Sequence, residues 1–204
     1  MKTYLFTLLF ALVSMSILAQ KEPFEGHIIY RYQFFDLDGN DISAKMLTEK
    51  DSVQHYYINK ANYVTYNQNQ VLSQLYNSGT NQYFYSRANN IYVLDAGKST
   101  TSKPTYKKQK EEKTILGNKC YALQKGEGSN KMIYYVSENI WIDPSPFQNH
   151  NLGNWNEFLK QSKGRLALQI TTFHEDYYQT MTAVRIQKMS LPDEAYNIDK
   201  LIGN

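Results

Sequence analysis

Alternating apolar and polar positions run along most of the chain and predict short β-strands. In Arg165–Phe173, every second residue from Leu166 to Ile170 is apolar. Tyr177–Met189 alternates in a similar way. Successive side chains on a strand point to opposite faces, so this pattern gives a strand one face for the core. The other strands predicted in this way are Phe24–Phe35, Ser52–Ile58, Tyr63–Asn67, Gln70–Tyr76, Gln82–Ser86 and Asn90–Leu94.

A predicted hairpin lies near the middle of the sequence. Thr114–Leu123 and Lys131–Ile142 are joined by a Gly/Ser/Asn-rich turn, and we place this hairpin at the centre of a large antiparallel sheet. Gly117 interrupts the alternation as a bulge would. The preceding segment, Gly97–Lys113, is rich in Lys, Ser and Thr, which predicts a solvated loop or a charged sheet edge.

One convincing helix is predicted between Pro146 and Gly164. Asn154 is a candidate N-cap, and Gly164 can end the helix. Trp155, Phe158 and Leu159 fall on one face together with Ser162. Burying such side chains contributes about 1.5–3 kcal/mol each, so we expect this short helix to dock into a concave sheet. The tail that follows Leu191 is expected to return Tyr196 and Ile198 to the body.

The first residues have the pattern of a secretory signal peptide. Lys2 precedes an apolar run from Tyr4 to Leu18, and small Ala19 precedes Gln20. This pattern predicts export with cleavage near Ala19/Gln20. The run is too short for a transmembrane segment. We therefore divide the chain into a signal peptide, 1–19, and a single β domain, 20–204.

Composition adds constraints on partners and compartment. The formal net charge of +3 is too small to indicate a nucleic-acid partner. The single cysteine, Cys120, cannot form an internal disulfide, and its place in an alternating strand favours a buried core residue over a reactive thiol. Aromatic residues suit strands, and the chain has eighteen tyrosines. A row of eight of them could form a stacking platform for sugars or bases, although structural cross-strand pairs are the commoner use: Tyr56, Tyr57, Tyr63, Tyr66, Tyr76, Tyr83, Tyr85 and Tyr92.

Candidate chemistry is sparse. The acidic run Asp36–Asp41 resembles the start of a calcium loop, but the acid that should close such a loop is absent at Leu47, so we interpret the run as a turn. The four histidines lack metal-ligand spacing, and no nucleophile motif occurs. A hydrolase using His150 or His174 is the weakest hypothesis, because loop histidines are usually solvated. We predict no cofactor, no metal site and no catalytic residue.

Four short segments resemble a known family. They are Gly26–Tyr30, Ile115–Cys120, Lys163–Leu168 and Pro192–Tyr196. Together they resemble the GLPGLI-type uncharacterised secreted proteins of Gram-negative bacteria, which are similar in turn to the LolA/LolB-like lipoprotein-carrier fold. The resemblance implies a mainly β (α+β) domain, in which one strongly curved antiparallel sheet, a half-barrel, holds a short helix in its concave side. It also implies a hydrophobic cavity, and carrier relatives bind lipid or acyl chains.

The resulting functional hypothesis is an exported protein that binds an apolar or lipid-like ligand in the periplasm or at the cell surface. The predicted pocket residues are Trp155, Phe158, Leu159, Trp141 and Tyr134. The alternative is a structural or interaction module whose concavity is filled by its own side chains, with an envelope or surface protein as partner. An apolar pocket open to solvent favours the first hypothesis, and a fully packed interior favours the second.

Overall fold

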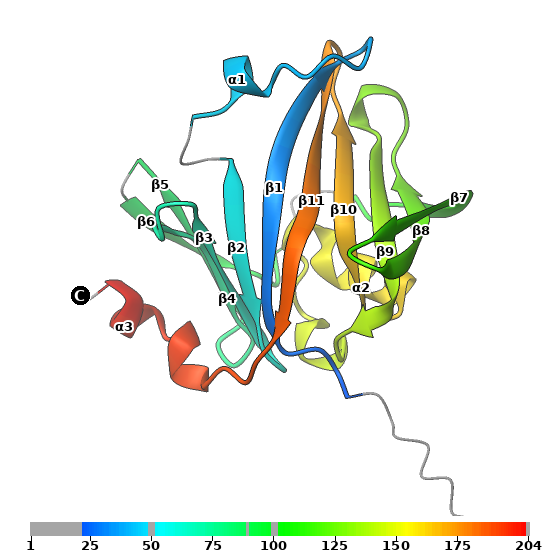
Figure 1. Cartoon of the computed structure of the whole chain (residues 1–204). Coiled ribbons are helices and arrows are strands. Elements are labelled where there is room, and N and C mark those ends of the chain that lie inside the picture. Colours follow the sequence, from blue (N-terminus) through cyan, green and yellow to red (C-terminus); the bar gives the residue numbers. More distant parts are fainter. Residues whose placement is uncertain (1–21, 49–51, 89, 99–101, 203–204) are drawn as a thin grey trace, which may run out of the picture.

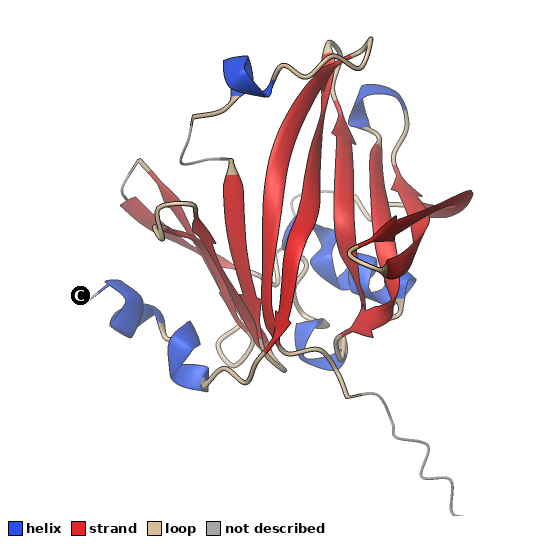
Figure 2. Ribbon diagram, viewed as in Figure 1, coloured by secondary structure: helices blue, strands red, loops and turns tan. Residues whose placement is uncertain are grey.

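The mainly β antiparallel prediction is confirmed. The computed structural model describes residues 22–48, 52–88, 90–98 and 102–202 (Figure 1), so the predicted signal peptide lies outside the described residues. Strands dominate this part of the chain, and the helices are short (Figure 2). The eleven strands of the described residues are β1 (Gly26–Asp36), β2 (Val53–Ile58), β3 (Asn62–Asn67), β4 (Leu72–Asn77), β5 (Gln82–Arg87), β6 (Asn90–Asp95), β7 (Tyr106–Ile115), β8 (Asn118–Lys125), β9 (Met132–Trp141), β10 (Arg165–Phe173) and β11 (Tyr177–Lys188).

The strands form one sheet in which the first and last strands pair. The order is β6-β5-β4-β3-β2-β1-β11-β10-β9-β8-β7. β1 pairs with β11 from Gly26 opposite Lys188 to Asp36 opposite Tyr177. The centre of the sheet is therefore β1 and β11, and our placement of the middle hairpin at the centre is wrong. That hairpin, β8 and β9, lies beside the edge strand β7.

The C-terminal part of the Lys-rich segment Gly97–Lys113 lies in β7, the charged edge strand of the sheet. β7 carries six Lys and Glu side chains, and seven of its ten residues are exposed; charged edges discourage pairing with other chains. Gly117 is not a bulge, because it occupies the tight turn between β7 and β8 with Leu116, both at positive φ (74° and 49°). Cys120 is fully buried, as predicted, and burial raises the pKa of its thiol to about 11.

The acidic run Asp36–Asp41 forms a turn, as predicted. The Asp36 carboxylate accepts hydrogen bonds from the backbone N–H and the side-chain amide of Asn40, both at 2.8 Å. These bonds lower the pKa of Asp36. Among the described residues, no cluster of three metal-binding side chains occurs here or elsewhere. The region that follows contains the single-turn helix α1 (Ser43–Met46).

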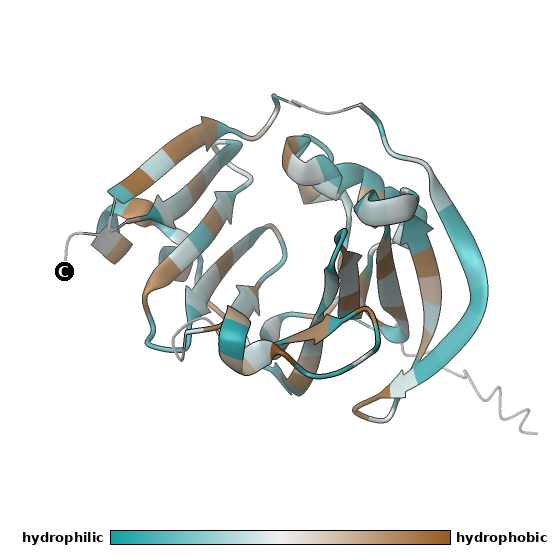
Figure 3. Cartoon of the chain, turned by 90° about the horizontal axis from the view of Figure 1, so that it is seen from above, coloured by the Kyte–Doolittle hydropathy of each residue, from teal (hydrophilic) through white to brown (hydrophobic). Residues whose placement is uncertain are grey.

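The predicted helix is α2 (Trp155–Ser162), which buries Phe158, Leu159 and Ser162. It lies on one face of the sheet, between the two ends of the strand array (Figure 3); we call this the inner face. Asn154 directly precedes the helix, but its backbone is left-handed (φ 61°) and its side chain does not cap the helix, so the predicted side-chain N-cap is wrong. The half-barrel description of the sheet remains a prediction.

Both faces of the β3–β5 region are covered. On the inner face, Tyr63 and Tyr76 join the main core with α2. On the outer face, Val64, Leu75 and Phe84 form a second core with Tyr196, which is fully buried. Tyr196 belongs to the short helix η5 (Asp193–Tyr196), which is followed by α3 (Ile198–Ile202). The prediction that the tail returns to the body is confirmed. The remaining short helices of the described residues are η2 (Gly128–Asn130), η3 (Ser145–Phe147) and η4 (Leu152–Asn154).

Candidate functional site

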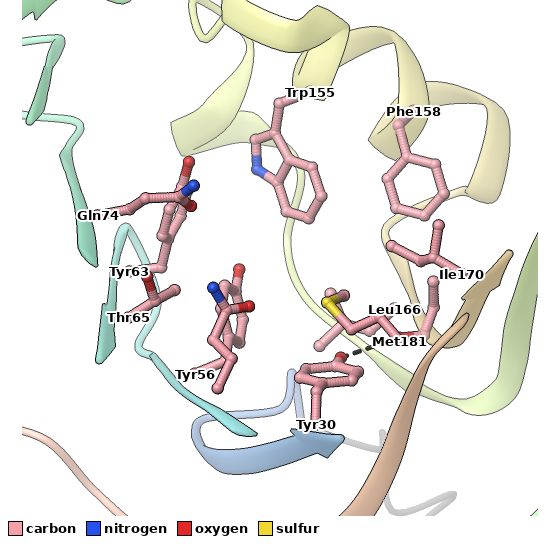
Figure 4. A pocket seen from close by; sticks show the side chains of 12 residues that line it. Tyr30, Tyr56, Tyr63, Thr65, Gln74, Trp155, Phe158, Leu166, Ile170 and Met181 are labelled. Atoms are coloured by element: carbon pink, nitrogen blue, oxygen red, sulfur yellow. Dashed lines mark hydrogen bonds between the residues drawn. The ribbon is translucent and has the colours of Figure 1, made fainter. Parts of the chain in front are cut away.

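A partly enclosed cavity lies between α2 and the inner face of the sheet. Its volume is about 180 Å³, and residues from β1, β2, β3, β4, β10 and β11 line it together with α2 (Figure 4). We call it the α2 cavity. Its lining residues are Tyr30, Gln54, Tyr56, Tyr63, Thr65, Gln74, Trp155, Phe158, Leu166, Ala167, Ile170 and Met181. None of these side chains is charged, so the cavity suits an uncharged group.

One wall of the α2 cavity is apolar. It consists of Phe158 from α2, Leu166 and Ile170 from β10, and Met181 from β11 (Figure 4). Phe158 is held by stacking on Trp155, with ring centroids 5.4 Å apart. Such a wall offers dispersion contacts and no hydrogen bonds, which favours the hydrocarbon part of a ligand.

The opposite wall is polar. It consists of Tyr56, Tyr63, Thr65 and Gln74 from β2, β3 and β4, and the indole nitrogen of Trp155 faces this side (Figure 4). Within the described part of the chain, the buried Tyr56 Oη, Thr65 Oγ1 and Trp155 Nε1 atoms have no hydrogen-bond partner. Buried polar atoms without a partner are uncommon, because each costs free energy. The α2 cavity thus has two chemically different sides.

The two remaining tyrosines of the cavity have partners. The Tyr30 hydroxyl donates to the carbonyl oxygen of Ala167 at 2.9 Å, which ties β1 to β10. The Tyr63 hydroxyl lies 2.8 Å from Nε2 of His150, and this contact is buried. His150 is therefore packed behind Tyr63 and does not line the cavity. Burial lowers the pKa of His150 to about 4, so its imidazole is neutral at pH 7.

The end of α2 fixes its position over the sheet. Gly164 has a positive φ of 75°, and a Cβ atom there would lie 2.2 Å from the carbonyl oxygen of Ile142. Only glycine fits this close approach. The Gly164 N–H donates to the carbonyl oxygen of Leu159 at 2.7 Å, and the Ile142 N–H donates to the carbonyl oxygen of Gly164 at 2.9 Å. These bonds join the helix end to the chain after β9.

The structure places two of the five predicted pocket residues, Trp155 and Phe158, in the lining of the cavity. Leu159 is buried in the core. Tyr134 lies behind Phe158, with ring centroids 4.8 Å apart. Trp141 lies at the end of β9, opposite Arg165 and away from the lining. Leu159 and Tyr134 therefore pack behind the site, and Trp141 is not part of it.

Sequence reasoning missed most of the sheet's contribution to the cavity. Tyr56 and Tyr63 belong to the tyrosine row noted above, so their aromatic content was visible in the sequence. Thr65 and Met181 carried no such signal, because nothing in their local sequence distinguishes them from other strand residues. His174, the second histidine considered for catalysis, stacks on Tyr177 next to the β10–β11 turn and does not line the cavity.

A second hollow adjoins the α2 cavity on the same face of the sheet. Its volume is about 280 Å³, and Gln54 lines both spaces. Tyr32 and Phe34 continue the row that Tyr30 begins along β1, and Leu47 lies at the far end. The two hollows therefore follow one line along the inner face of the sheet.

Comparisons with known proteins identify no family. No family model and no curated protein matches the chain. Two crystal forms of PNGF-II are similar to it, with TM-scores of 0.48 and 0.47 and sequence identities of 15% and 14%. Each match covers 84% of this chain but only 29% and 30% of the PNGF-II chains. No helix among the described residues has the length and apolar character needed to cross a membrane.

Proposed function

We propose that this chain is an exported binding protein that holds an apolar or lipid-like ligand on the concave side of a strongly curved, half-barrel sheet. The single observation that carries the proposal is the α2 cavity, which is partly enclosed and has an apolar wall. A structural module with a self-filled interior would not need such a space. The resemblance to GLPGLI-type proteins with a LolA/LolB-like fold agrees with this function, and it favours the periplasm or the cell surface as the location.

The volume of the site limits the size of the ligand. The α2 cavity, at about 180 Å³, is close to a cavity of about 150 Å³ that accepts benzene. It is small beside the roughly 300–1,000 Å³ of typical ligand pockets. A longer ligand would extend past Gln54 into the adjoining hollow of about 280 Å³. We therefore propose a ligand with a slender hydrocarbon portion, such as an alkyl or acyl chain.

The two tryptophans of the chain allow a direct test, because Trp155 lines the cavity and Trp141 does not. A Trp141→Phe variant has Trp155 as its only indole, and a Trp155→Phe variant has Trp141. Titration with 1-bromohexane, whose bromine quenches indole fluorescence on contact, should give saturable quenching in Trp141→Phe. The matched Trp155→Phe variant should show only weak, linear quenching.

Linear quenching in both variants would contradict ligand binding in the cavity. The natural ligand can be sought by native mass spectrometry of the chain purified from its own cell envelope. We expect an added mass that disappears when the protein is incubated with excess 1-bromohexane. An unmodified mass would favour the structural module.

A further inference from the structure

The polar wall of the α2 cavity contains unsatisfied hydrogen-bonding atoms, and they lie close to one another in the fold. Thr65 on β3 pairs directly with Tyr56 on β2, and Trp155 contacts the neighbouring Tyr63 edge-on, with ring centroids 6.0 Å apart. Thr65 is 1% exposed. Tyr56 Oη, Thr65 Oγ1 and Trp155 Nε1 are all buried without a partner in the described part of the chain.

The hydrogen-bonding capacity of these three atoms determines which ligand groups could pair with them. An indole N–H can only donate, whereas the two hydroxyl groups can donate or accept. A ligand oxygen with lone pairs can therefore accept from Trp155 and from either hydroxyl. A pure hydrocarbon would leave all three groups unsatisfied, which is unfavourable in a buried site.

The absence of charged side chains from the lining limits the class of ligand further. None of the twelve lining residues is Lys, Arg or His, and none is Asp or Glu. A carboxylate or an ammonium group would lose its hydration without a compensating partner charge. The amides of Gln54 and Gln74, which also line the cavity, are neutral as well. The site should therefore bind anions and cations more weakly than neutral groups.

We propose that the polar wall is the subsite for an uncharged oxygen of the ligand, a hydroxyl or an ester carbonyl, bound by Trp155 Nε1 and the hydroxyls of Tyr56 and Thr65. The hydrocarbon part then lies against Phe158, Ile170 and Met181. The ligand class is a neutral amphiphile with an alcohol or ester group. This inference rests on the proposed binding function and specifies the ligand of the same cavity.

The test compares three probes with the same chain length in the Trp141→Phe reporter background. The probes are 1-bromohexane, 1-hexanol and hexanoate, and the two oxygen-bearing probes are measured by displacement of 1-bromohexane. Hexanol should displace 1-bromohexane, and hexanoate at pH 7 should displace it at least tenfold less effectively, because no cation lines the cavity.

Two nearly isosteric variants test the named atoms. Thr65→Val and Tyr56→Phe each remove one hydroxyl and keep the packing, so hexanol affinity should fall about fivefold to tenfold, as expected for one hydrogen bond. The affinity for 1-bromohexane should stay the same or rise. Thr180→Val is the matched control, because it removes a buried threonine hydroxyl that does not line the cavity; it should leave the hexanol to bromohexane ratio unchanged.

The outcomes separate the two proposals. If 1-bromohexane binds but hexanoate competes as well as hexanol, the neutral-oxygen subsite is wrong and the binding function stands. The subsite is also wrong if Thr65→Val and Tyr56→Phe leave the ratio between hexanol and bromohexane unchanged, since solvent would then satisfy these groups. If 1-bromohexane does not bind to the reporter protein, the binding function itself fails.

Discussion

His150 should make the stability of the protein depend on pH. It is 2% exposed, and its ring stacks on Tyr76 with centroids 4.2 Å apart. Its pKa is about 4 in the folded chain, against an ordinary value of 6.5. Between these values the unfolded chain binds the extra proton. This contribution to stability is therefore complete above about pH 6.5 and is lost as the pH falls toward 4, by roughly 3 kcal/mol in total.

A His150→Gln variant should make this effect visible. It removes the titrating group, so its melting temperature should fall less between pH 7 and pH 4.5 than that of the unmodified protein. The absolute stability at pH 7 is not the test, because the variant also loses packing. The pKa values of His27 and His55 are also lowered by burial, but this pair is present in both proteins. Parallel pH profiles would show that His150 does not titrate as described.

His150 also marks a limit of residue-level prediction. A histidine in a Pro/Asn-rich loop is usually solvated, and no local pattern around His150 indicates burial. The loop instead folds back, and the Asn151 N–H donates to the carbonyl oxygen of Ala96, after β6, at 2.8 Å. This contact joins segments distant in the sequence. Cys120 was predictable because its neighbours alternate on one strand, so local pattern sufficed.

At the scale of elements, the C-terminal segment should stabilise the sheet through Tyr196. Its side chain is fully buried against Val64, Leu75 and Phe84. Tyr196→Ala should lower the free energy of unfolding by about 3–5 kcal/mol, the usual cost of removing a buried aromatic ring. Urea unfolding measures this change. Tyr196→Phe is the matched control, because the Tyr196 hydroxyl is buried without a partner among the described residues.

The control should be neutral or slightly stabilising, since it removes an unsatisfied polar group and keeps the ring. A small effect of Tyr196→Ala would mean that the tail does not contribute to the fold. Large and equal losses in both variants would instead show that the hydroxyl has a partner that matters.

Strands and the helix were predicted well, and their order in the sheet was not. Alternation identified β10 with its observed bounds, Arg165–Phe173, because that pattern is local. The position of the middle hairpin was wrong because the centre of the sheet depends on the pairing of β1 with β11, whose paired residues Gly26 and Lys188 are 162 positions apart in the sequence. No local pattern encodes that pairing.

The cavity is a property of the whole molecule. Its walls come from strands at both ends of the chain and from α2 between them. From the sequence, the helix could be assigned a docking role through Trp155 and Phe158, since two large aromatics on a short helix need burial. The opposing residues, such as Thr65 and Met181, acquire their role only when the sheet brings them together. Ten of the twelve residues that line the cavity were therefore not predicted as pocket residues from the sequence.

Phe24, near the first of the described residues, gives a last prediction. Phe24 is 3% exposed, and its backbone N–H donates to the carbonyl oxygen of Trp141 at 2.6 Å. If cleavage occurs near Ala19/Gln20, the mature chain keeps this anchor. A chain that begins at Gln20 should therefore fold fully, whereas one that begins at Glu25 should lose about 3 kcal/mol or more, because it lacks a buried phenylalanine.

Two measurements check this boundary. N-terminal sequencing of the exported protein should give a first residue at or close to Gln20, and a product that still begins at Met1 would contradict export with cleavage. Urea unfolding should then distinguish the two shortened chains, with the chain that begins at Lys21 as a control for length alone. Equal stability of all three would mean that Phe24 contributes nothing. A loss confined to the chain from Glu25 would place the edge of the folded domain at Phe24, close behind the predicted cleavage site.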